Sequence, residues 1–250
     1  YNLQSGSYIK LYEEKKSSFK KLHDELSLKM IDFFKEFDVK PKSLLDAGCG
    51  EMTTLTSIIN RFPFELDVYA FDTSIPRVLL GRDFFNKNIS VDSKLISFIS
   101  SMSEIPLPSN SIDVVMTHHS IEPNNRYEKK IINELFRVTK KILIMFEPSF
   151  VRGSPEIKKR MSTLNYAKNI DKHAKKISGY IRTEAINNSI NKLNPTYFHV
   201  LAKNNINKKS GKINFTSPGT DFKLYQKCSW FHSKEFNLIF PIFKDLPILK

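Results

Sequence analysis

The fold of this chain is decided by residues 44–51, which read LLDAGCGE. The apolar run Ser43 to Ala47 predicts a buried strand that enters a tight turn at the two glycines. Thr53 or Thr54 is suited to cap the helix that follows. A strand, a glycine turn and a helix N-terminus in this order let a ligand approach the backbone. Thr53 stands where a dinucleotide-binding turn has its third glycine, so a dinucleotide site is disfavoured.

Strands and helices alternate beyond this turn. We expect strands at Leu66–Phe71, Lys94–Ser100, Ile112–Thr117, Lys141–Phe146 and Tyr197–Ala202. Helices are expected at Tyr8–Asp38, Ile75–Phe85, Arg126–Thr139 and, as one helix or a pair, Pro155–Ile177. The alternation predicts an α/β fold with a doubly wound, mostly parallel, Rossmann-like sheet of seven strands. An N-terminal helix and a small C-terminal appendage complete the expected architecture.

We expect three parts along the chain. Residues 1–40 would form a helical lid, residues 41–204 a ligand-binding main domain, and residues 205–250 a tail. The tail begins in a stretch rich in Asn, Lys, Ser and Gly, 204–219, which is typical of a linker or mobile loop. Its apolar end, 238–249, is too short for a core of its own and should dock on the main domain.

The charge is unevenly distributed. The 250 residues carry a net charge of +13, and residues 1–150 hold 20 basic and 20 acidic side chains, against 19 and 6 in residues 151–250. This asymmetry indicates either an anionic partner or a solvated lysine-rich face. Two cysteines cannot make a disulfide framework, and we find no secretory signal or run of about 20 apolar residues. We therefore expect a cytoplasmic protein without membrane insertion.

A second motif lies one strand and one helix later. Asp72 ends the second predicted strand, 22 residues after Gly50. At this place in a doubly wound sheet, an acidic side chain accepts hydrogen bonds from the hydroxyls of a ribose. Asp72 also suits the cap of the next helix, together with Thr73 and Ser74, and the two roles are compatible.

Four ordered elements resemble the class I S-adenosylmethionine-dependent methyltransferases: LLDAGCG at 44–50, FDTS at 71–74, SEIPLPSNSIDVVMTHH at 103–119 and RVTKKILIMFEP at 137–148. The resemblance covers about residues 40–150 and implies S-adenosylmethionine as the cofactor. It places Asp72 on the ribose and the glycine turn at the methionine end. It also implies adenine contacts near position 101, where many relatives carry an Asp that this chain lacks. The implied cofactor-binding residues are Asp46, Gly48, Gly50, Asp72, Thr73, Ser101, Met102 and Thr117.

Methyl transfer requires alignment of the acceptor with the methyl group, and a base when the acceptor begins as a hydroxyl or ammonium. Candidates beyond the fourth and fifth strands are His118, His119 and Glu147, with Glu122 behind them. Neighbours on a strand point to opposite faces, so at most one histidine should enter the site, as a base or as a pocket wall. Glu147 is suited to orient a substrate or to cap the next turn. Residues 119–124 and 147–148 resemble a methyltransferase subgroup with "HxxEPN" and "EP" motifs.

The leading functional interpretation is methyl transfer to a hydroxyl or amine of a small molecule, such as a sugar, a secondary metabolite or a phosphate- or carrier-linked intermediate. Glu122, Arg152 and Arg160 are the expected substrate-binding residues, since guanidinium groups bind phosphate or carboxylate well. One alternative is an RNA methyltransferase that uses the basic last hundred residues. Another is a non-catalytic binding module with a methyltransferase-like fold.

The end of the chain resembles zinc-ribbon tails that read "YPIxDGIPxL": residues 240–249 read FPIFKDLPIL. A structural zinc site needs about four Cys or His ligands. Cys228 has only His232 near it in sequence. The resemblance therefore implies a degenerate ribbon that keeps its docking strand, and we expect no metal site.

Overall fold

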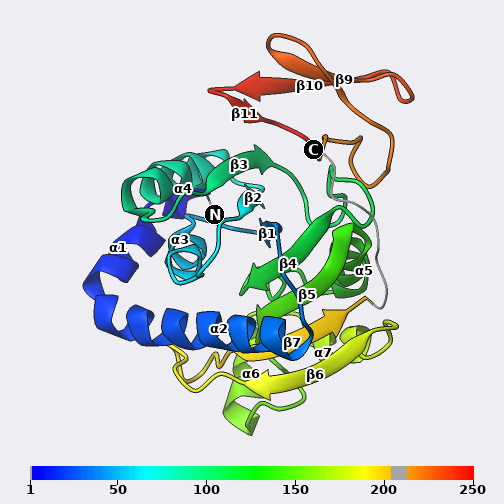
Figure 1. Ribbon diagram of the computed structural model, residues 1–250. Coiled ribbons are helices and arrows are strands. Elements are labelled where there is room, and N and C mark those ends of the chain that lie inside the picture. Colours follow the sequence, from blue (N-terminus) through cyan, green and yellow to red (C-terminus); the bar gives the residue numbers. More distant parts are fainter. Residues whose placement is uncertain (1, 204–212) are drawn as a thin grey trace.

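A computed structural model describes residues 2–203 and 213–250. Its centre is a seven-stranded sheet with the order β3-β2-β1-β4-β5-β7-β6 (Figure 1). The strands are β1 (Ser43–Ala47), β2 (Asp67–Asp72), β3 (Lys94–Ile99), β4 (Ile112–His118), β5 (Thr139–Glu147), β6 (Tyr180–Ala185) and β7 (Tyr197–Ala202). Strands β1 to β5 pair in parallel, and β7 pairs antiparallel with both β5 and β6. The predicted doubly wound, mostly parallel sheet is confirmed.

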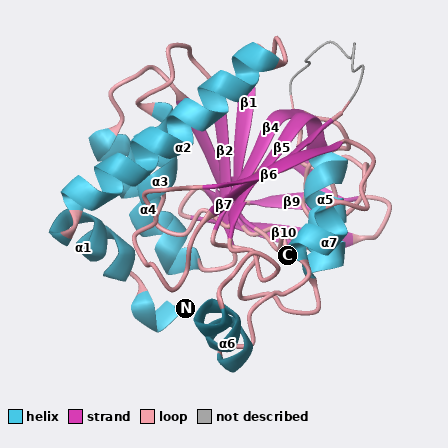
Figure 2. Ribbon diagram, turned by 90° about the horizontal axis from the view of Figure 1, so that it is seen from below, coloured by secondary structure: helices cyan, strands magenta, loops and turns pink. Residues whose placement is uncertain are grey.

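Helices cover both faces of the sheet (Figure 2). The first face carries α1 (Ser7–Glu14), α2 (Lys16–Glu36), α3 (Thr53–Ile59) and α4 (Ile75–Asn88), and a short 3-10 turn, η1 (Asn2–Gln4), precedes them. The other face carries α5 (Glu128–Val138) and α7 (Ile170–Ala174). The predicted single helix at Tyr8–Asp38 is wrong in one respect: Lys15 leaves helical geometry, with φ −114° and ψ 31°, and separates α1 from α2.

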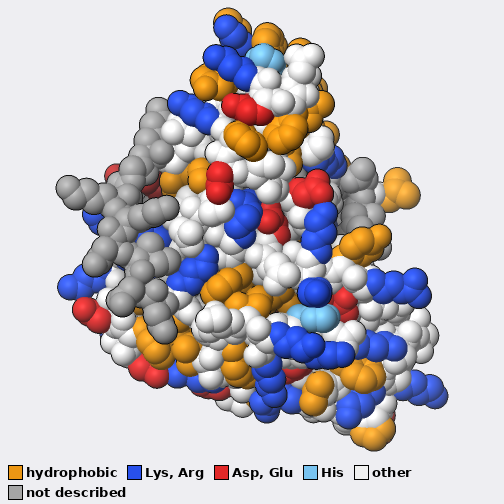
Figure 3. Space-filling view, turned by 90° about the vertical axis from the view of Figure 1, so that its right-hand side faces the viewer, with side chains coloured by type: hydrophobic (Ala, Val, Ile, Leu, Met, Phe, Trp, Pro, Cys, Tyr) orange, Lys and Arg blue, Asp and Glu red, His pale blue; other side chains and the backbone are white. Residues whose placement is uncertain are grey.

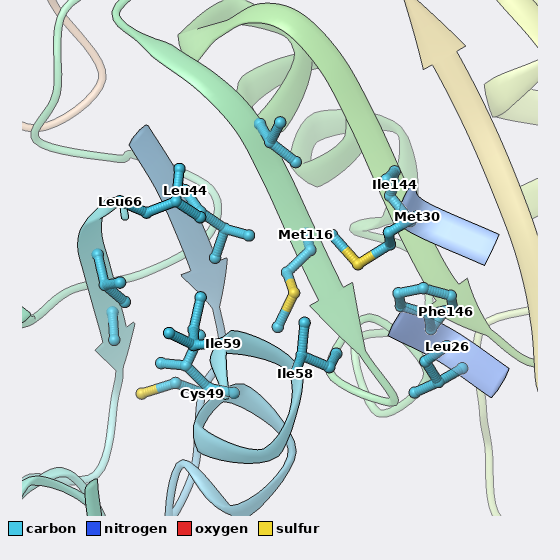
Figure 4. Close-up of a cluster of buried hydrophobic side chains, with 14 of the residues drawn as sticks. Leu26, Met30, Leu44, Cys49, Ile58, Ile59, Leu66, Met116, Ile144 and Phe146 are labelled. Atoms are coloured by element: carbon cyan, nitrogen blue, oxygen red, sulfur yellow. The ribbon is translucent and has the colours of Figure 1, made fainter. Parts of the chain in front are cut away.

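A buried apolar layer between the sheet and the first helix face holds these elements together (Figure 4). Met116 of β4 and Ile144 of β5 lie near Met30 of α2, and all three side chains are fully buried. Ile58 of α3 fills the neighbouring space. The apolar three- and four-residue spacing in the two helices accounts for this packing, and it fixes the strand ends at which the site is built.

One open alternative is decided, and one strand differs from the sequence-based expectation. The segment Pro155–Ile177 forms a pair of short helices, α6 (Pro155–Thr163) and α7, with extended chain between them. Strand β6 was not predicted, because it alternates charged and apolar residues instead of forming an apolar run. Its Arg182 pairs with Glu36 of α2 at 2.7 Å, and its Glu184 pairs with Lys29 of the same helix at 2.7 Å. These ion pairs explain why a strand of the main sheet carries charged residues.

The tail forms a second, four-stranded sheet of β8 (Tyr225–Gln226), β9 (Trp230–Ser233), β10 (Leu238–Phe243) and β11 (Leu246–Pro247) (Figure 1). Just after β11, Ile248 forms a parallel bridge with Ile99 of β3, and the Leu249 N–H donates to the Ile99 carbonyl at 2.8 Å. Leu246 and Leu249 are fully buried. The predicted linker at 204–219 lies outside the described residues over 204–212. The three-part division of the chain stays a prediction.

The described residues contain neither a membrane-spanning helix nor a cluster of metal-binding side chains. None of the described helices is long and apolar enough to cross a membrane. Within residues 2–203 and 213–250, no cluster of three or more His, Cys, Asp or Glu side chains is arranged to hold a metal ion. Cys49 and Cys228 are both free thiols, the first buried and the second exposed.

Candidate active site

Two adjoining cavities lie at the carboxyl ends of the parallel strands. The larger cavity, of about 720 Å³, is lined mainly by the turns after β1, β2, β3 and β4. Its lining residues are Gln4, Tyr8, Gly48, Phe71, Asp72, Thr73, Arg77, Ser100, Ser101, Met102, Ser103, His119, Ser120, Glu122, Pro123, Asn124, Tyr127, Ile131 and Tyr166. Seven of the predicted site residues are therefore brought to this cavity: Gly48, Asp72, Thr73, Ser101, Met102, His119 and Glu122.

The smaller cavity, of about 350 Å³, is enclosed by the N-terminal helices, the turn after β1, α6 and the segment before β7. Its lining residues are Tyr8, Leu11, Phe19, Leu22, Asp46, Gly48, Cys49, Gly50, Glu51, Thr53, Thr54, Arg77, His118, His119, Glu122, Arg160, Tyr166, Ile190, Asn191, Asn194 and Thr196. The two cavities share Gly48, Tyr8, His119, Glu122, Arg77 and Tyr166. A ligand in one would therefore face a ligand in the other.

Gly48 forms the shared wall. Its φ of 80° lies in the left-handed region that side chains disfavour, and its N–H donates to the Phe71 carbonyl at 2.8 Å. A Cβ at this position would lie 2.5 Å from Cβ of Ser120, which is closer than such atoms approach one another. The missing side chain therefore lets Ser120, in the loop after β4, pack directly against the turn after β1.

Asp72 presents its carboxylate at the end of β2. One oxygen accepts the Gly50 N–H at 3.1 Å, and the other accepts the Ser74 N–H at 2.9 Å. Each carboxylate oxygen offers two acceptor sites, so both keep capacity for a further donor. Asp72 thus combines the two predicted roles: it organises the glycine turn and the start of α4, and it still has capacity for the hydroxyls of a ribose.

Asp46 lies in the floor of the smaller cavity and is only 3% exposed. Burial, with the nearby charges of Asp72 and Glu147, raises the pKa of Asp46 to about 8. The carboxyl is therefore largely protonated at neutral pH while it faces only protein. A cation beside it, such as an ammonium group, would favour the ionised form.

The N-terminal segment closes over the junction of the cavities through Glu51, which follows the glycine turn directly. The buried Glu51 carboxylate accepts the N–H groups of Gly6 at 3.0 Å and Ile9 at 2.8 Å, and it pairs with Arg77 of α4 at 3.4 Å. The ring of Tyr8 lies 4.4 Å from the Arg77 guanidinium carbon. Sequence reasoning missed Glu51, Arg77 and Tyr8, because their pairing depends on contacts between distant segments.

His119 is held by hydrogen bonds on both ring nitrogens. Its Nδ1 lies 2.9 Å from the Glu122 carboxylate, and its Nε2 lies 2.8 Å from the Thr196 hydroxyl. Asn194 donates to the same Glu122 oxygen at 3.0 Å. Burial lowers the pKa of His119, but the hydrogen bond and charge of Glu122 outweigh it, so the pKa is raised overall. The carboxylate of Glu122 therefore favours the protonated form of His119. The residues Asn194 and Thr196 were not predicted.

His118 differs from His119 in its electrostatics, because its pKa is lowered and that of His119 is raised. Its Nδ1 lies 3.2 Å from the Thr54 hydroxyl, which also lies 3.3 Å from Nε2 of His23 in α2. The Nε2 of His118 has no hydrogen-bond partner in the part of the chain that the structure describes. Burial, with the charges of His119 and His23, holds the pKa of His118 well below its usual value. This imidazole is neutral at physiological pH.

Both histidines line the smaller cavity, and the expectation that at most one would enter the site is wrong. Strand β4 ends at His118, and His119 adopts a left-handed φ of 51°. The alternation of a strand no longer applies across that bond. The rings are instead perpendicular, with centroids 5.0 Å apart.

Two predicted residues on the central strands, Glu147 of β5 and Thr117 of β4, do not reach the cavities. Glu147 is fully buried, and its carboxylate accepts the backbone N–H groups of Ser120, Ile121 and Glu122 at 3.0 to 3.2 Å. It therefore positions the loop after β4 and cannot touch an acceptor. Burial raises the pKa of Glu147 to about 7. Thr117 is also fully buried within β4 and lines neither cavity, because the neighbouring position 118 points toward the smaller one.

The two predicted arginines separate. Arg160 of α6 lines the smaller cavity, and its guanidinium carbon lies 5.5 Å from the ring centroid of Tyr166. Arg152 is exposed and lines neither cavity, because it precedes α6 in a surface turn. The expected convergence of Arg152 and Arg160 is therefore wrong. Elsewhere, basic side chains are spread over the face in Figure 3, with acidic and hydrophobic side chains between them.

Comparisons with known proteins agree with this geometry. Residues 45–144 match the model of a family described as a methyltransferase domain. The comparison with curated proteins gives no match. Among solved structures, magnesium protoporphyrin IX methyltransferase (ChlM) from Synechocystis PCC 6803 is similar, with a TM-score of 0.58 and 12% identity over 78% of this chain and 87% of that one.

Two further structures share the fold. A putative sarcosine dimethylglycine methyltransferase from Galdieria sulphuraria has a TM-score of 0.53 and 12% identity, over 79% of this chain and 85% of that one. A chain from the complex between the Haloferax volcanii Trm112 methyltransferase activator and a putative methyltransferase has a TM-score of 0.53 and 9% identity, over 68% and 85%.

Residues 45–144 thus match a methyltransferase domain, and the protein is a methyltransferase. The sequence resemblance implies S-adenosylmethionine as the cofactor, and ChlM, which shares the fold, has been solved with it bound. The residues present fit this group. Gly48 brings backbone without a side chain to the boundary of both cavities, and Asp72 keeps free acceptor capacity beside the larger cavity.

Proposed function

We propose that the protein transfers the methyl group of S-adenosylmethionine to a hydroxyl or amine of a small molecule held in the smaller cavity. The observation that carries the proposal is that the two cavities adjoin across Gly48. Asp72, Thr73, Ser101 and Met102 would hold the adenosine part in the larger cavity. Asp46, Gly48 and Gly50 would meet the methionine end at the boundary.

When bound, the cofactor would supply a methyl group on a positively charged sulfur: the acceptor lone pair would bond to the methyl carbon, and the C–S electron pair would stay with sulfur. The chain must align the acceptor atom with that group and remove its proton. His118 is suited to take the proton, because its ring is neutral and its Nε2 has no partner among the described residues. His119 is suited to hold the acceptor in place, because Glu122 and Thr196 fix its ring in the wall of the smaller cavity.

Enclosure favours a small acceptor. The smaller cavity is surrounded by α1, α2, α6 and the segment before β7, and its volume of about 350 Å³ is at the low end for small-molecule sites. An RNA substrate would instead need a continuous basic track along the surface. Of the two arginines predicted to bind a substrate, Arg160 lines the smaller cavity and Arg152 lines neither cavity, so they form no such track.

The test begins with mass spectrometry of the purified protein and calorimetry with S-adenosylmethionine and its demethylated product. We expect binding of one equivalent and transfer of a labelled methyl group to a small acceptor from a metabolite panel. Failure to bind either form of the cofactor would support a non-catalytic module. Tight binding of generic RNA, with a salt dependence that indicates release of several counterions, would support an RNA methyltransferase instead.

A further inference from the structure

The smaller cavity holds a cation, Arg160, that forms no ion pair with the acidic side chains of the described residues. Arg160 lines this cavity from α6, and its Nη1 atom is buried without a hydrogen-bond partner among residues 2–203 and 213–250. A buried donor without a partner costs about 1–3 kcal/mol, and more when it is charged. Such an atom is expected to gain its partner when a ligand binds.

The acidic side chains that line the same cavity either pair with other residues or are protonated. The Glu51 carboxylate pairs with Arg77 at 3.4 Å, and the Glu122 carboxylate lies 2.9 Å from Nδ1 of His119. Asp46 is largely protonated near neutral pH, since burial raises its pKa to about 8. The ligand that completes this cavity must therefore bring the negative charge for Arg160.

A second buried atom restricts the ligand further. Asn194 donates its Nδ2 to Glu122 at 3.0 Å, and this contact fixes the orientation of the amide because a carboxylate only accepts. The Oδ1 of Asn194 is buried and has no partner in the described ranges. A bound molecule that offers an O–H or N–H group would satisfy it. A ligand that satisfies both buried atoms therefore carries an anionic group for Arg160 and an O–H or N–H donor for Asn194.

We propose that the methyl acceptor is a small carboxylic acid carrying a hydroxyl or amine, and that Arg160 binds its carboxylate. This inference rests on the proposed function of the smaller cavity. A guanidinium offers two parallel donors that match a carboxylate, and the adjacent ring of Tyr166, 5.5 Å from the guanidinium carbon, supports its plane. The hydroxyl or amine of the acid lies on the side of Asn194 and His118, where its proton is removed.

The cofactor has a carboxylate of its own, so the experiment must separate the two sources. Calorimetry is carried out on protein saturated with S-adenosylhomocysteine, using pairs of probes with and without the carboxylate: anthranilate and aniline, salicylate and phenol, sarcosine and dimethylamine. We expect at least one acid to bind, and its carboxylate-free counterpart to bind at least about 10-fold more weakly.

The variants are Arg160→Leu, Arg160→Lys and, as a matched control, Arg152→Leu at the exposed arginine outside both cavities. Arg160→Leu should weaken binding of the acid about 10- to 100-fold and leave the affinity for S-adenosylhomocysteine unchanged. Arg160→Lys keeps the charge without the fork and should show an intermediate loss. Arg152→Leu should behave as the unaltered protein.

Three outcomes overturn the inference. None of the acids binds to the saturated protein, or the acids bind equally well to Arg160→Leu, or that variant loses affinity for S-adenosylhomocysteine instead. The last outcome would assign Arg160 to the cofactor carboxylate. Failure of the proposed function itself is distinguishable, because it would appear as absent cofactor binding in the unaltered protein or as salt-sensitive RNA binding.

Discussion

The two cavities adjoin, yet they are built from different kinds of structure. The larger one is walled mainly by turns between residues 48 and 131, where each strand of the parallel sheet ends. The smaller one is walled largely by side chains drawn from residues 8–54, 160–166 and 190–196. Backbone hydrogen bonds of the sheet hold the first in shape, whereas contacts such as those between His119, Glu122 and Asn194 hold the second.

This difference separates cofactor binding, which stays constant in the class, from acceptor recognition, which varies. A wall of backbone turns can change little without disturbing the sheet, which suits a cofactor that every member of the class shares. A wall of side chains from separate helices and loops can change one residue at a time. Acceptor choice is therefore expected to depend on α6, the N-terminal helices and the segment before β7.

Asp72→Ala should give the largest effect, on binding in the larger cavity. The change removes a charged acceptor beside the ribose position and should weaken binding of S-adenosylhomocysteine by about 2–4 kcal/mol. Calorimetry measures the loss. Asp72→Asn, which keeps the shape and one acceptor oxygen, should lose less. An unchanged affinity in Asp72→Ala would contradict the assignment of this cavity to the adenosine part.

Glu51→Gln tests the wall that both cavities share. The amide keeps one acceptor oxygen but loses the charge that pairs with Arg77, in a side chain with no exposed surface. We expect a loss of about 1–3 kcal/mol in the free energy of unfolding, measured in urea, because breaking a buried pair leaves a charge without compensation. Limited proteolysis should cut the first 15 residues faster, and an unchanged cleavage rate would show that Glu51 does not hold this segment.

Asp46→Asn tests the floor of the smaller cavity through pH. The folded protein keeps the Asp46 proton up to about pH 8, whereas the unfolded chain releases it near 3.8. The folded state thus binds more protons between these values, and the free energy of unfolding falls as pH rises, by up to about 1.4 kcal/mol per pH unit.

In Asp46→Asn this dependence should be shallower, and the variant should gain stability relative to the unaltered protein toward pH 8. Urea unfolding at several pH values between about 5 and 8 measures the two slopes. Glu147, whose pKa is raised to about 7, contributes a similar slope to both proteins and serves as the internal reference. Identical slopes would show that Asp46 is ionised in the folded state.

Asn125→Ala should give the smallest effect, at the outer rim. The Nδ2 of Asn125 donates to Oδ1 of Asn165 at 2.7 Å and links the loop after β4 to the turn after α6. The contact is exposed, so its loss should cost about 0.5–1 kcal/mol at most. We expect unchanged binding of S-adenosylhomocysteine and a small rise in KM for the acceptor. Weaker cofactor binding would show that the rim serves both cavities.

The contrast between the cavities also explains what the sequence could predict. The apolar strands, the glycine turn and Asp72 are local signals within residues 43–72, and they located the edge of the sheet at which the larger cavity lies. Glu51, Asn194 and Thr196 have no such signal, because each acquires its role from a partner more than 40 residues away. Strand β6 escaped prediction for a related reason: its charged residues are explained only by their ion pairs with α2.

The errors at His119 and Glu147 have one common cause. A residue at the end of a strand was assigned to a face by alternation or by its place in a motif. The structure instead gives His119 a left-handed φ of 51° and aims Glu147 at three backbone N–H groups. The fold as a whole determines the backbone dihedral angles at strand ends and which loop N–H groups need a side-chain acceptor.

The short contact between the end of the chain and β3 has a consequence for the behaviour of the protein in a crowded solution. Strand β3 is the outermost strand of the main sheet on its side, and such strands present unpaired N–H and C=O groups to other chains. Ile248 and Leu249 occupy part of that edge with the chain's own backbone. The tail therefore protects this edge of β3 from pairing with a strand of another molecule.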